Sequence, residues 1–330
     1  MKGQAVKVIN GLRYNGARSN LASINAYSVC LQELGSPYAF TPWLYGATGI
    51  PFLFRTGDDV NTAPVLHELP YGRMVAQLQN LGVQVEGVSA VAEGETLDRL
   101  RRESWEACRI AIGSGFPCFG RGFVFNGGET SIVQGYDDKD AAYICSCWNG
   151  TTTVEWQSLG ERDGLVDIHW MRRNGQTEEN VRKTVADALQ LAVEFAAGKL
   201  TGPQTYTGNR AYRRWSAELR KGAVDGWFFA YNTHEWDTCR SNGYKFLLKA
   251  KERLGSETPE ALERAIESFG LVRDRFHRIY ELFPWEQPRG LIEDTERRLE
   301  AAALLEEADA YDSATIAAFR EVVEALNGGE

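Results

Sequence analysis

Residues 115 to 148, GFPCFGRGFVFNGGETSIVQGYDDKDAAYICSCW, form the stretch of sequence that decides the fold. Three apolar runs, FPCFGRGFVF, SIVQGY and AAYICSCW, are separated by Asn-Gly-Gly and by Asp-Asp-Lys-Asp. Short apolar runs rich in aromatic and β-branched residues predict strands, and Gly, Asn and Asp between them predict tight turns. The stretch therefore predicts three consecutive strands of an antiparallel sheet.

The segments around this stretch mix helical and strand periodicity. Residues 19–34 predict a helix, with Ser19 or Asn20 as the expected N-cap and Gly35 after its end. The run IPFLF at 50–54 predicts a further strand. We therefore expect an α+β domain in the first part of the chain.

The second part of the chain is helical in pattern from about residue 177 onward. Apolar residues recur there at helical spacing, and Asp312 is the expected N-cap of the last helix. The sequence thus predicts an α+β domain over residues 1–175, with an antiparallel sheet, followed by an all-α domain over residues 176–330.

The composition and net charge of the chain indicate which kinds of binding partner and which location to expect. The chain has 330 residues, 43% of them hydrophobic, and a formal net charge of −9. The acidic balance argues against nucleic acid as a partner, because phosphate neutralisation needs a basic excess. The apolar runs are too short to cross a bilayer, and the first residues lack the apolar core of a signal peptide. Six cysteines without CxxC pairing predict reduced thiols and a cytoplasmic location.

Four segments together resemble one family. The likeness rests first on the helix ending SVCLQELG and on the segment LYGATGIPFLF. It rests also on the GFP and IVQGYDD runs of the three predicted consecutive strands, called the meander below, and on the later GNRAYRRWSAEL and DTCRSNGYKFLLKA runs. They are similar to the papain-like proteins related to bacteriocin-processing cysteine peptidases, of the type named for butirosin biosynthesis protein H. The resemblance implies a papain-like first domain with a helical second domain, and acyl transfer from a carrier protein where a nucleophile is present.

The resemblance also implies where catalytic groups would lie. The family places a Cys at the start of the first helix, a His on the meander and an Asp or Asn after the next strand. In this sequence the helix start, residues 20 to 23, contains no Cys. Glu129 and Thr130 occupy the His position, and Asn149 is the suitable residue at the third position. We therefore expect the standard thiolate–imidazole chemistry to be missing.

Altered chemistry is the alternative that these residues leave open. Ser23 could serve as a hydroxyl nucleophile, with Glu129 as a base if burial raises the pKa of that carboxyl. Cys30, about two turns into the helix, is the candidate for a displaced thiol. Cys145 and Cys147 share a strand face, but no second Cys or His pair has the spacing of a zinc site, so no metal is expected.

A polar segment in the second domain, NTHEWDTCR, is the other candidate site. His234, Asp237 and Arg240 lie in it on one predicted helix. They are interpreted either as a polar network that docks the helical domain on the first domain or as a wall that contacts a ligand. With Asn20, Ala22 and Trp148 they make up the expected binding residues.

Two functions follow from these observations. The first is a catalytically degenerate papain-like protein that acts as a binding or scaffold module for a peptide, a small molecule or an acyl-bearing partner. The second is an acyl or peptidyl transferase, or a hydrolase, that uses Ser23 or a displaced Cys with Glu129. No phosphate-cradling loop is present in the sequence, so no cofactor is expected.

Overall fold

The computed structural model describes residues 6–19, 21–61, 69–123, 129–173, 179–202, 204–286 and 289–328. The chain divides into two compact units. Unit 1 comprises residues 1–44 and 81–178, and unit 2 comprises residues 45–80 and 179–330. Residues 45–80 therefore fold with the C-terminal helices, a grouping that a single boundary near residue 175 does not give.

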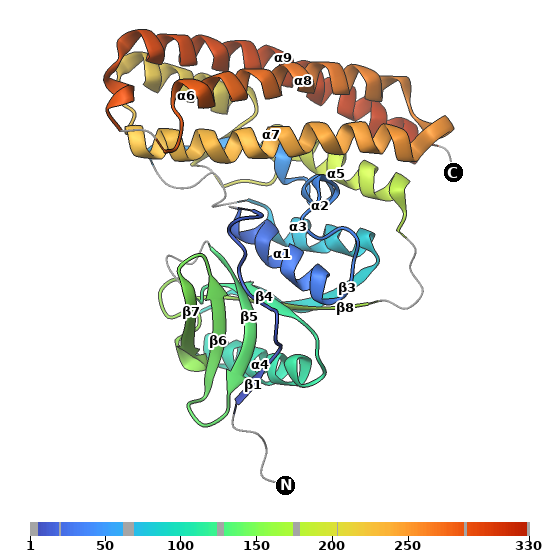
Figure 1. Ribbon diagram of the computed structural model, residues 1–330, viewed down its shortest axis with the longest axis vertical. Helices are drawn as coiled ribbons and strands as arrows, with labels where there is room; N and C mark the ends of the chain where they lie inside the picture. The colour runs from blue at the N-terminus through green and yellow to red at the C-terminus, as the bar shows by residue number, and fades with distance from the viewer. Residues whose placement is uncertain are drawn as a thin grey trace. The chain divides into compact units, whose positions relative to one another are not determined.

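Unit 1 is built on a seven-stranded antiparallel sheet (Figure 1). The strand order is β3-β8-β4-β5-β6-β7, and β1 pairs with β5 off this path. The strands and helices of the unit are β1 (Val6–Val8), α1 (Ala22–Glu33), β3 (Val83–Val91), α4 (Gly94–Gly113), β4 (Cys118–Arg121), β5 (Thr130–Asp137), β6 (Ala142–Cys147), β7 (Gly150–Glu155) and β8 (Leu165–Arg173), with a 3-10 turn at Trp156–Ser158. The three strands expected within residues 115–148 are β4, β5 and β6, and they are neighbours in the sheet.

The two faces of this sheet are covered by different helices. Helix α4 packs on one face, where it buries Trp105 and Cys108 against Val133 and Tyr143. Helix α1 packs on the opposite face, where the ring of Tyr27 lies 5.1 Å from that of Phe119 in an edge-to-face contact. Successive side chains of a strand point to opposite faces, so Cys118 belongs to the α4 core and Phe119 to the α1 side.

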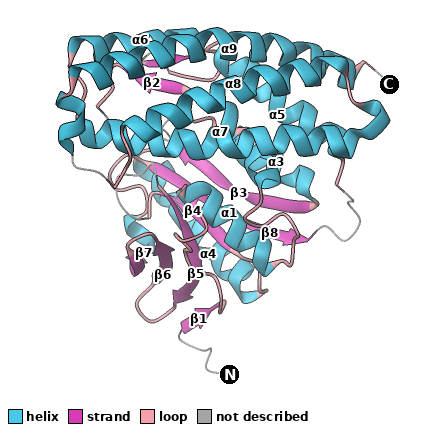
Figure 2. Cartoon of the chain, turned by 45° about the horizontal axis from the view of Figure 1, so that its top comes forward, coloured by secondary structure: helices cyan, strands magenta, loops and turns pink. Residues whose placement is uncertain are grey.

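Unit 2 is predominantly helical (Figure 2). A short two-stranded sheet pairs β2 with β9. The elements of the unit are α3 (Tyr71–Gln77), α5 (Val181–Ala196), α6 (Asn209–Lys221), α7 (Gly226–Leu254), α8 (Glu260–Leu282), α9 (Thr295–Asn327), β2 (Arg55–Gly57) and β9 (Thr205–Thr207), with 3-10 turns at Ile50–Phe52, Gly255–Glu257 and Arg289–Glu293. Two further short helices, α2 (Pro42–Ala47) and the 3-10 turn Leu78–Leu81, span the unit boundaries.

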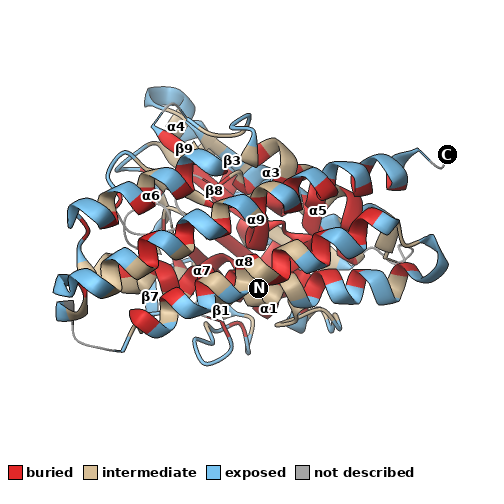
Figure 3. Ribbon diagram, turned by 90° about the horizontal axis from the view of Figure 1, so that it is seen from above, coloured by how far each residue is buried: buried red, intermediate tan, exposed pale blue. Residues whose placement is uncertain are grey.

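The long helices of unit 2 bury one face each. Helix α8 packs beside both α7 and α9, and α6 and α5 pack on α9. Figure 3 shows buried residues along their inward faces and exposed residues along their outward faces. Among the helices that the structure describes, none has an apolar stretch long enough to span a membrane.

The expected strand at 50–54 is wrong. Ile50–Phe52 form a 3-10 turn, with Pro51 in its first positions, and the strand begins only at Arg55. Proline fixes its own backbone dihedral and lacks an N–H, so it suits the start of a helical turn better than a strand interior. The side chain of Phe52 packs against the rings of Phe269 and Phe319, at centroid distances of 5.1 and 5.2 Å. This packing places the segment in unit 2.

The expected cap at Asp312 is also wrong. Helix α9 is continuous from Thr295, and its cap is Asp294, whose side chain accepts hydrogen bonds from the backbone N–H groups of Glu296 and Arg297. Asp312 lies in the middle of this helix and is buried. Burial raises the pKa of its carboxyl to about 6, although the charge of Arg240 opposes the shift. It is therefore an interior group of unit 2.

Candidate functional site

The start of helix α1 is held by an interior side chain. The N-cap position falls on Leu21, which makes no side-chain capping bond, so the expected cap at Ser19 is wrong, and Asn20 lies outside the described residues. The Asn25 amide donates to the carbonyls of Asn15 (2.8 Å) and Ser19 (2.9 Å) and accepts the Asn15 N–H at 3.0 Å. Asn25 thereby ties the preceding loop to the first turn of the helix.

Ser23 lies in this first turn and points toward the sheet. Ser23, Tyr27 and Cys30 recur at the spacing of one helix face, and Tyr27 and Cys30 both contact β4. Ser23 is 2% exposed, and its hydroxyl has no hydrogen-bond partner. The neighbouring Ala22, an expected binding residue, is nearly buried as well. The candidate nucleophile is thus in place, but no base is bonded to it.

A second buried hydroxyl without a partner lies on the same side of the sheet. Thr130, at the position where the resemblance implies a His, pairs across the sheet with Arg121, which follows Phe119 by two residues on the α1 side. The Thr130 hydroxyl is buried and makes no hydrogen bond. Leaving such a group unsatisfied costs about 1–3 kcal/mol. Two buried hydroxyls are therefore unsatisfied on this side of unit 1, that of Ser23 on α1 and that of Thr130 on the sheet face that α1 covers.

The cross-strand neighbours of Thr130 on the adjoining strands belong to a cluster of charged side chains. The register places Arg121 between Thr130 and Asp167. Arg121 Nε lies 2.7 Å from Asp167 Oδ2, and His169 Nε2 lies 3.1 Å from Asp167 Oδ1. Burial alone would raise the pKa of Asp167, but the hydrogen bonds from His169 and Arg121 and the charge of Arg121 hold it well below its usual range. The His169 ring stacks on Phe119 at 5.4 Å, which fits a structural role.

Glu129 and Trp148 form the exposed part of the site. The Trp148 indole N–H donates to Glu129 Oε2 at 2.8 Å, and Trp148 is 57% exposed. Burial raises the pKa of Glu129, and the bond from the indole partly offsets this shift. Asn149 follows in the exposed turn that joins β6 to β7, where Gly150 takes a left-handed conformation with φ of +104°. The structure therefore joins Glu129 to Trp148 and places Asn149 beside them.

The cysteines are buried thiols. Cys30 donates a weak hydrogen bond to the Cys118 carbonyl, and burial together with the charge of Glu33 raises the pKa of its thiol. Burial likewise raises the pKa of Cys118 and Cys145. Because the thiolate is the nucleophilic form, these shifts oppose a displaced-thiol mechanism at Cys30. Within the described ranges, no group of three or more His, Cys, Asp or Glu side chains is placed to hold a metal ion.

Arg240, expected in a ligand-contacting wall, lies in the core of unit 2. It is fully buried and donates to the Pro51 carbonyl and to the Tyr212 hydroxyl, at 3.3 Å for the latter. Four rings surround its guanidinium at 5.1 to 5.6 Å: Phe54, Trp236, Phe269 and Phe276. Arg240 therefore ties elements within unit 2 together, and its interpretation as a ligand contact is corrected.

His234 and Asp237 lie on the same helix but closer to its surface. The His234 ring lies 5.5 Å from Tyr280, and Asp237 Oδ1 lies 3.3 Å from His277 Nδ1. Both contacts are made within unit 2. The sequence could not assign His234, Asp237 and Arg240 to different faces, because polar residues crowd the whole NTHEWDTCR segment.

The sequence places Glu235 within the polar NTHEWDTCR segment, but it did not indicate that this residue has the most perturbed pKa among the carboxyls of the helix. Glu235 is 1% exposed, its Oε2 atom has no hydrogen-bond partner, and burial raises its pKa to about 8. The feature of the sequence that could have indicated the burial of Glu235 is its position next to Trp236, which is also buried. Thr130 was identified from the sequence as an occupant of the His position, but the burial of its hydroxyl without a hydrogen-bond partner was not predicted.

The fold and site together define an α+β protein with an antiparallel sheet and a helical C-terminal region. Comparison with known proteins adds no narrower class, since no family model and no curated sequence matches the chain. Its function must therefore be argued from its own residues.

Proposed function

We propose that the protein is a catalytically degenerate member of the papain-like class that binds a peptide or acyl-bearing partner through unit 1. The observation that carries this proposal is the Trp148–Glu129 pair. Trp148 is the aromatic side chain among the strongly exposed large hydrophobic residues that the structure describes, and its indole is fixed by a side-chain hydrogen bond. An exposed aromatic ring held in one orientation loses little conformational entropy on binding.

The surroundings of Trp148 suit an extended chain. Glu129 uses Oε2 for the indole, which leaves Oε1 as an acceptor for a backbone N–H of a ligand. The amide of Asn149, in the exposed turn, supplies both a donor and an acceptor. Hydrogen bonds of this kind position a peptide backbone, while the indole face accommodates one apolar or acyl group.

The chemistry at the start of α1 supports binding more than turnover. The Ser23 hydroxyl has no hydrogen bond to a base, and the raised pKa of the Cys30 thiol disfavours its reactive form. The helix–sheet packing through Tyr27 and Phe119 uses neither group. The frame of unit 1 can therefore persist without a nucleophile.

A peptide selection tests the binding proposal. A random heptapeptide phage library is panned on the full chain, and the selected peptide is labelled and titrated by fluorescence anisotropy. Trp148→Ala is expected to weaken its binding at least tenfold, in the range typical of a central aromatic contact. Ile110→Ala, which removes another strongly exposed apolar side chain of unit 1, is the matched control and should leave binding unchanged. Equal affinities for wild type and Trp148→Ala, or a selection that yields no binder, would count against the proposal.

The raised pKa of Glu129 favours one alternative, acyl transfer by Ser23. In that reaction Ser23 Oγ would attack the carbonyl carbon of a thioester and the C–S bond would break. The Ser23 proton would pass by way of Glu129 to the departing thiolate, leaving an acyl-serine ester. A carboxyl with a raised pKa is a better base once ionised than an ordinary one.

Thiol release from butyryl-N-acetylcysteamine thioester discriminates between the two functions. The binding proposal expects the same release rate for wild type, Ser23→Ala and Glu129→Gln. A rate above background that both variants abolish would establish the acyl-transfer alternative. A serine-directed fluorophosphonate probe gives a second readout, because it labels Ser23 in the native chain only if that hydroxyl is activated.

A further inference from the structure

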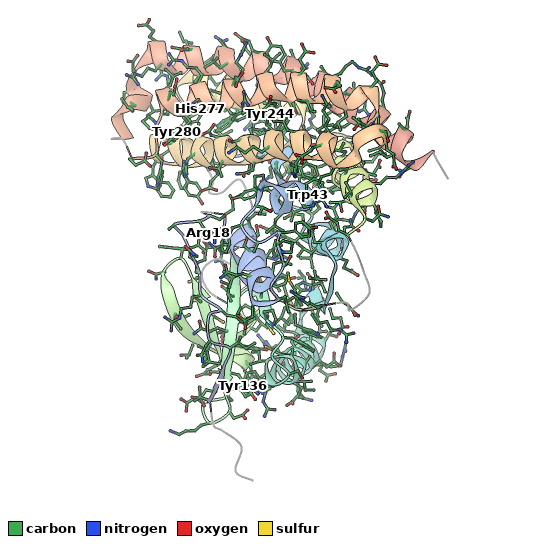
Figure 4. The ribbon with its side chains drawn as sticks, turned by 45° about the vertical axis from the view of Figure 1, so that its right-hand side comes forward. Arg18, Trp43, Tyr136, Tyr244, His277 and Tyr280 are labelled. Carbon is green, nitrogen blue, oxygen red and sulfur yellow. The ribbon has the colours of Figure 1, made fainter. Side chains whose placement is uncertain are left out.

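We infer that the partner of unit 1 is an extended peptide with basic residues near both of its ends, which adds as a further strand along the free edge of β7. This inference rests on the proposed function and names how the same site holds its peptide. Strand β7 begins at Gly150, directly after the turn of Trp148 and Asn149. It lies at one end of the strand order, with β6 as its neighbour. Figure 1 shows β7 as the last strand on its side of the sheet, and Figure 4, in which a label marks Tyr136 of β5, shows the same unit with side chains drawn.

The hydrogen-bond pattern of the β6–β7 pair decides which backbone groups of β7 face the free edge. In an antiparallel pair, residues that exchange backbone hydrogen bonds alternate with residues that direct both groups away from the partner strand. The N–H of Trp156, directly after β7, donates to the carbonyl of Ala141 at 3.1 Å, in register with the β6–β7 pairing. Counting back from Trp156, the residues that direct their N–H and C=O groups outward are Glu155, Thr153 and Thr151.

The free edge of β7 is exposed and unprotected. Thr151, Thr152 and Thr153 are exposed, and their register with β6 is unbroken. Proteins usually protect a free edge with charged side chains, Pro or a bulge, none of which occurs within residues 151–154. Within the residues that the structure describes, the outward N–H and C=O groups of Thr151 and Thr153 make no hydrogen bond. An extended peptide backbone satisfies such groups when it adds to a sheet as a further strand.

Carboxylates lie near both ends of this edge. At the first end, Glu129 accepts the indole N–H of Trp148 at 2.8 Å, and at the far end Glu155 is exposed. In the part of the chain that the structure describes, neither carboxylate forms an ion pair. A strand of six residues is about 20 Å long, so a peptide of about seven residues with Lys or Arg near both ends reaches both carboxylates.

The same charges disfavour a second copy of the chain as the added strand. Antiparallel pairing of β7 with itself in full register places Glu155 of one copy opposite Gly150 of the other. That glycine follows the turn of Trp148, whose indole binds Glu129, so carboxylates of the two copies approach each other at both ends. Like charges across a strand pair are destabilising, and each copy also has a net charge of −9. A basic peptide is therefore the complementary occupant.

The heptapeptide selected on the full chain is the probe for the mode of binding. Copies of it that each carry a methyl group on one backbone nitrogen are titrated by fluorescence anisotropy. Methylation at two positions that lie two residues apart should weaken binding about fivefold or more, because it removes hydrogen bonds to the carbonyls of Thr151 and Thr153. The position between them should change affinity by less than about twofold. A peptide that binds without this alternation overturns the inference and leaves the proposed function standing, whereas a selection without a binder removes both.

Variants of β7 test whether the peptide lies on this edge. Thr153→Pro removes an outward N–H that β6 does not use, at an edge position where Pro is tolerated, and should weaken peptide binding at least about fivefold. Thr153→Val keeps this N–H and is the matched control, with unchanged affinity. Glu155→Gln should weaken binding about twofold to threefold, and more at low salt, whereas Glu161→Gln, an exposed change outside β7, should not.

Sedimentation equilibrium without peptide tests the second copy as the occupant. The wild-type chain should show no dimer that depends on Thr153. A dimer that Thr153→Pro abolishes would assign the edge to a second copy and overturn the inference, as would unchanged peptide affinity in a folded Thr153→Pro chain. Should Thr153→Pro fail to fold by circular dichroism, the methylated peptides still decide.

Discussion

Replacing Glu235 by Gln should make the stability of unit 2 less dependent on pH. Glu235 is buried in α7 with one oxygen unsatisfied, and burial raises its pKa from an ordinary 4.5 to about 8. The folded chain therefore holds this proton up to about pH 8, while the unfolded chain releases it above pH 4.5. Stability from this group is fully present below pH 4.5 and is lost as pH rises through 8.

The size of the effect follows from the shift. Each pKa unit is worth 1.36 kcal/mol, so the 3.5-unit difference destabilises the fold by up to about 5 kcal/mol above pH 8 and about 3 kcal/mol at pH 7. Glutamine has a similar shape and carries no charge at any of these pH values. Relative to wild type, Glu235→Gln should gain about 3 kcal/mol between pH 4.5 and pH 7.

Urea unfolding followed by circular dichroism at 222 nm measures this difference at a series of pH values. Taking the difference between variant and wild type cancels the titration of all other groups to first order. Glu252→Gln is the matched control, because Glu252 lies on the same helix with a side chain that is 67% exposed. Its stability difference should be small and constant with pH. A constant difference for Glu235→Gln between pH 5 and pH 8 would refute the account of a neutral buried carboxyl.

Three further predictions test the interior of each unit. Arg240→Met should destabilise unit 2 by about 3–5 kcal/mol in urea unfolding, because it leaves the buried Asp312 without its compensating charge. Asp167→Asn should destabilise unit 1 by about 1–3 kcal/mol at pH 7, and this loss should stay constant down to pH 3.8 and then shrink progressively as pH falls from 3.8 toward the lowered pKa of Asp167 in the fold. Gly46→Ala should lower the thermal midpoint, since a Cβ there would lie 1.9 Å from the Phe246 ring; the control Gly72→Ala meets no atom within 4 Å and should be neutral or stabilising.

The sequence was most informative where local chemistry alone determines structure. Strands β4, β5 and β6 follow from apolar runs separated by turn residues, and the Asp137 carboxylate accepts the N–H of Lys139 as the predicted turn requires. Helix α1 lies within the predicted 19–34 because its apolar side chains recur at helical spacing. Its exact start did not follow, since a buried amide, Asn25, holds the preceding loop in place of a capping side chain.

The features that the sequence did not predict depend on contacts between residues that lie far apart in the chain. The segment after Tyr45 joins unit 2 because Phe52 and Phe54 pack among the rings of Phe246 on α7, Phe276 on α8 and Phe319 on α9, all of which lie far away in the sequence. Asp312 has the residue type of a cap, but the helix begins 17 residues earlier, at Thr295. The sequence predicted which positions make up the candidate site. It did not predict the hydrogen bond between Glu129 and Trp148, because that bond depends on where the fold places the two side chains.

Ser23 connects the stability of unit 1 with its function. Its buried hydroxyl makes no hydrogen bond, so Ser23→Ala should stabilise the chain by about 1 kcal/mol or more in urea unfolding. Ser28→Ala on the same helix is the matched control, because the equally buried Ser28 hydroxyl accepts the Phe40 N–H at 3.1 Å and its loss should destabilise. A hydroxyl that costs stability is explained most simply if a ligand or substrate supplies its missing partner. If Ser23→Ala destabilises the chain as much as Ser28→Ala does, the hydroxyl is satisfied within the fold, and that explanation fails.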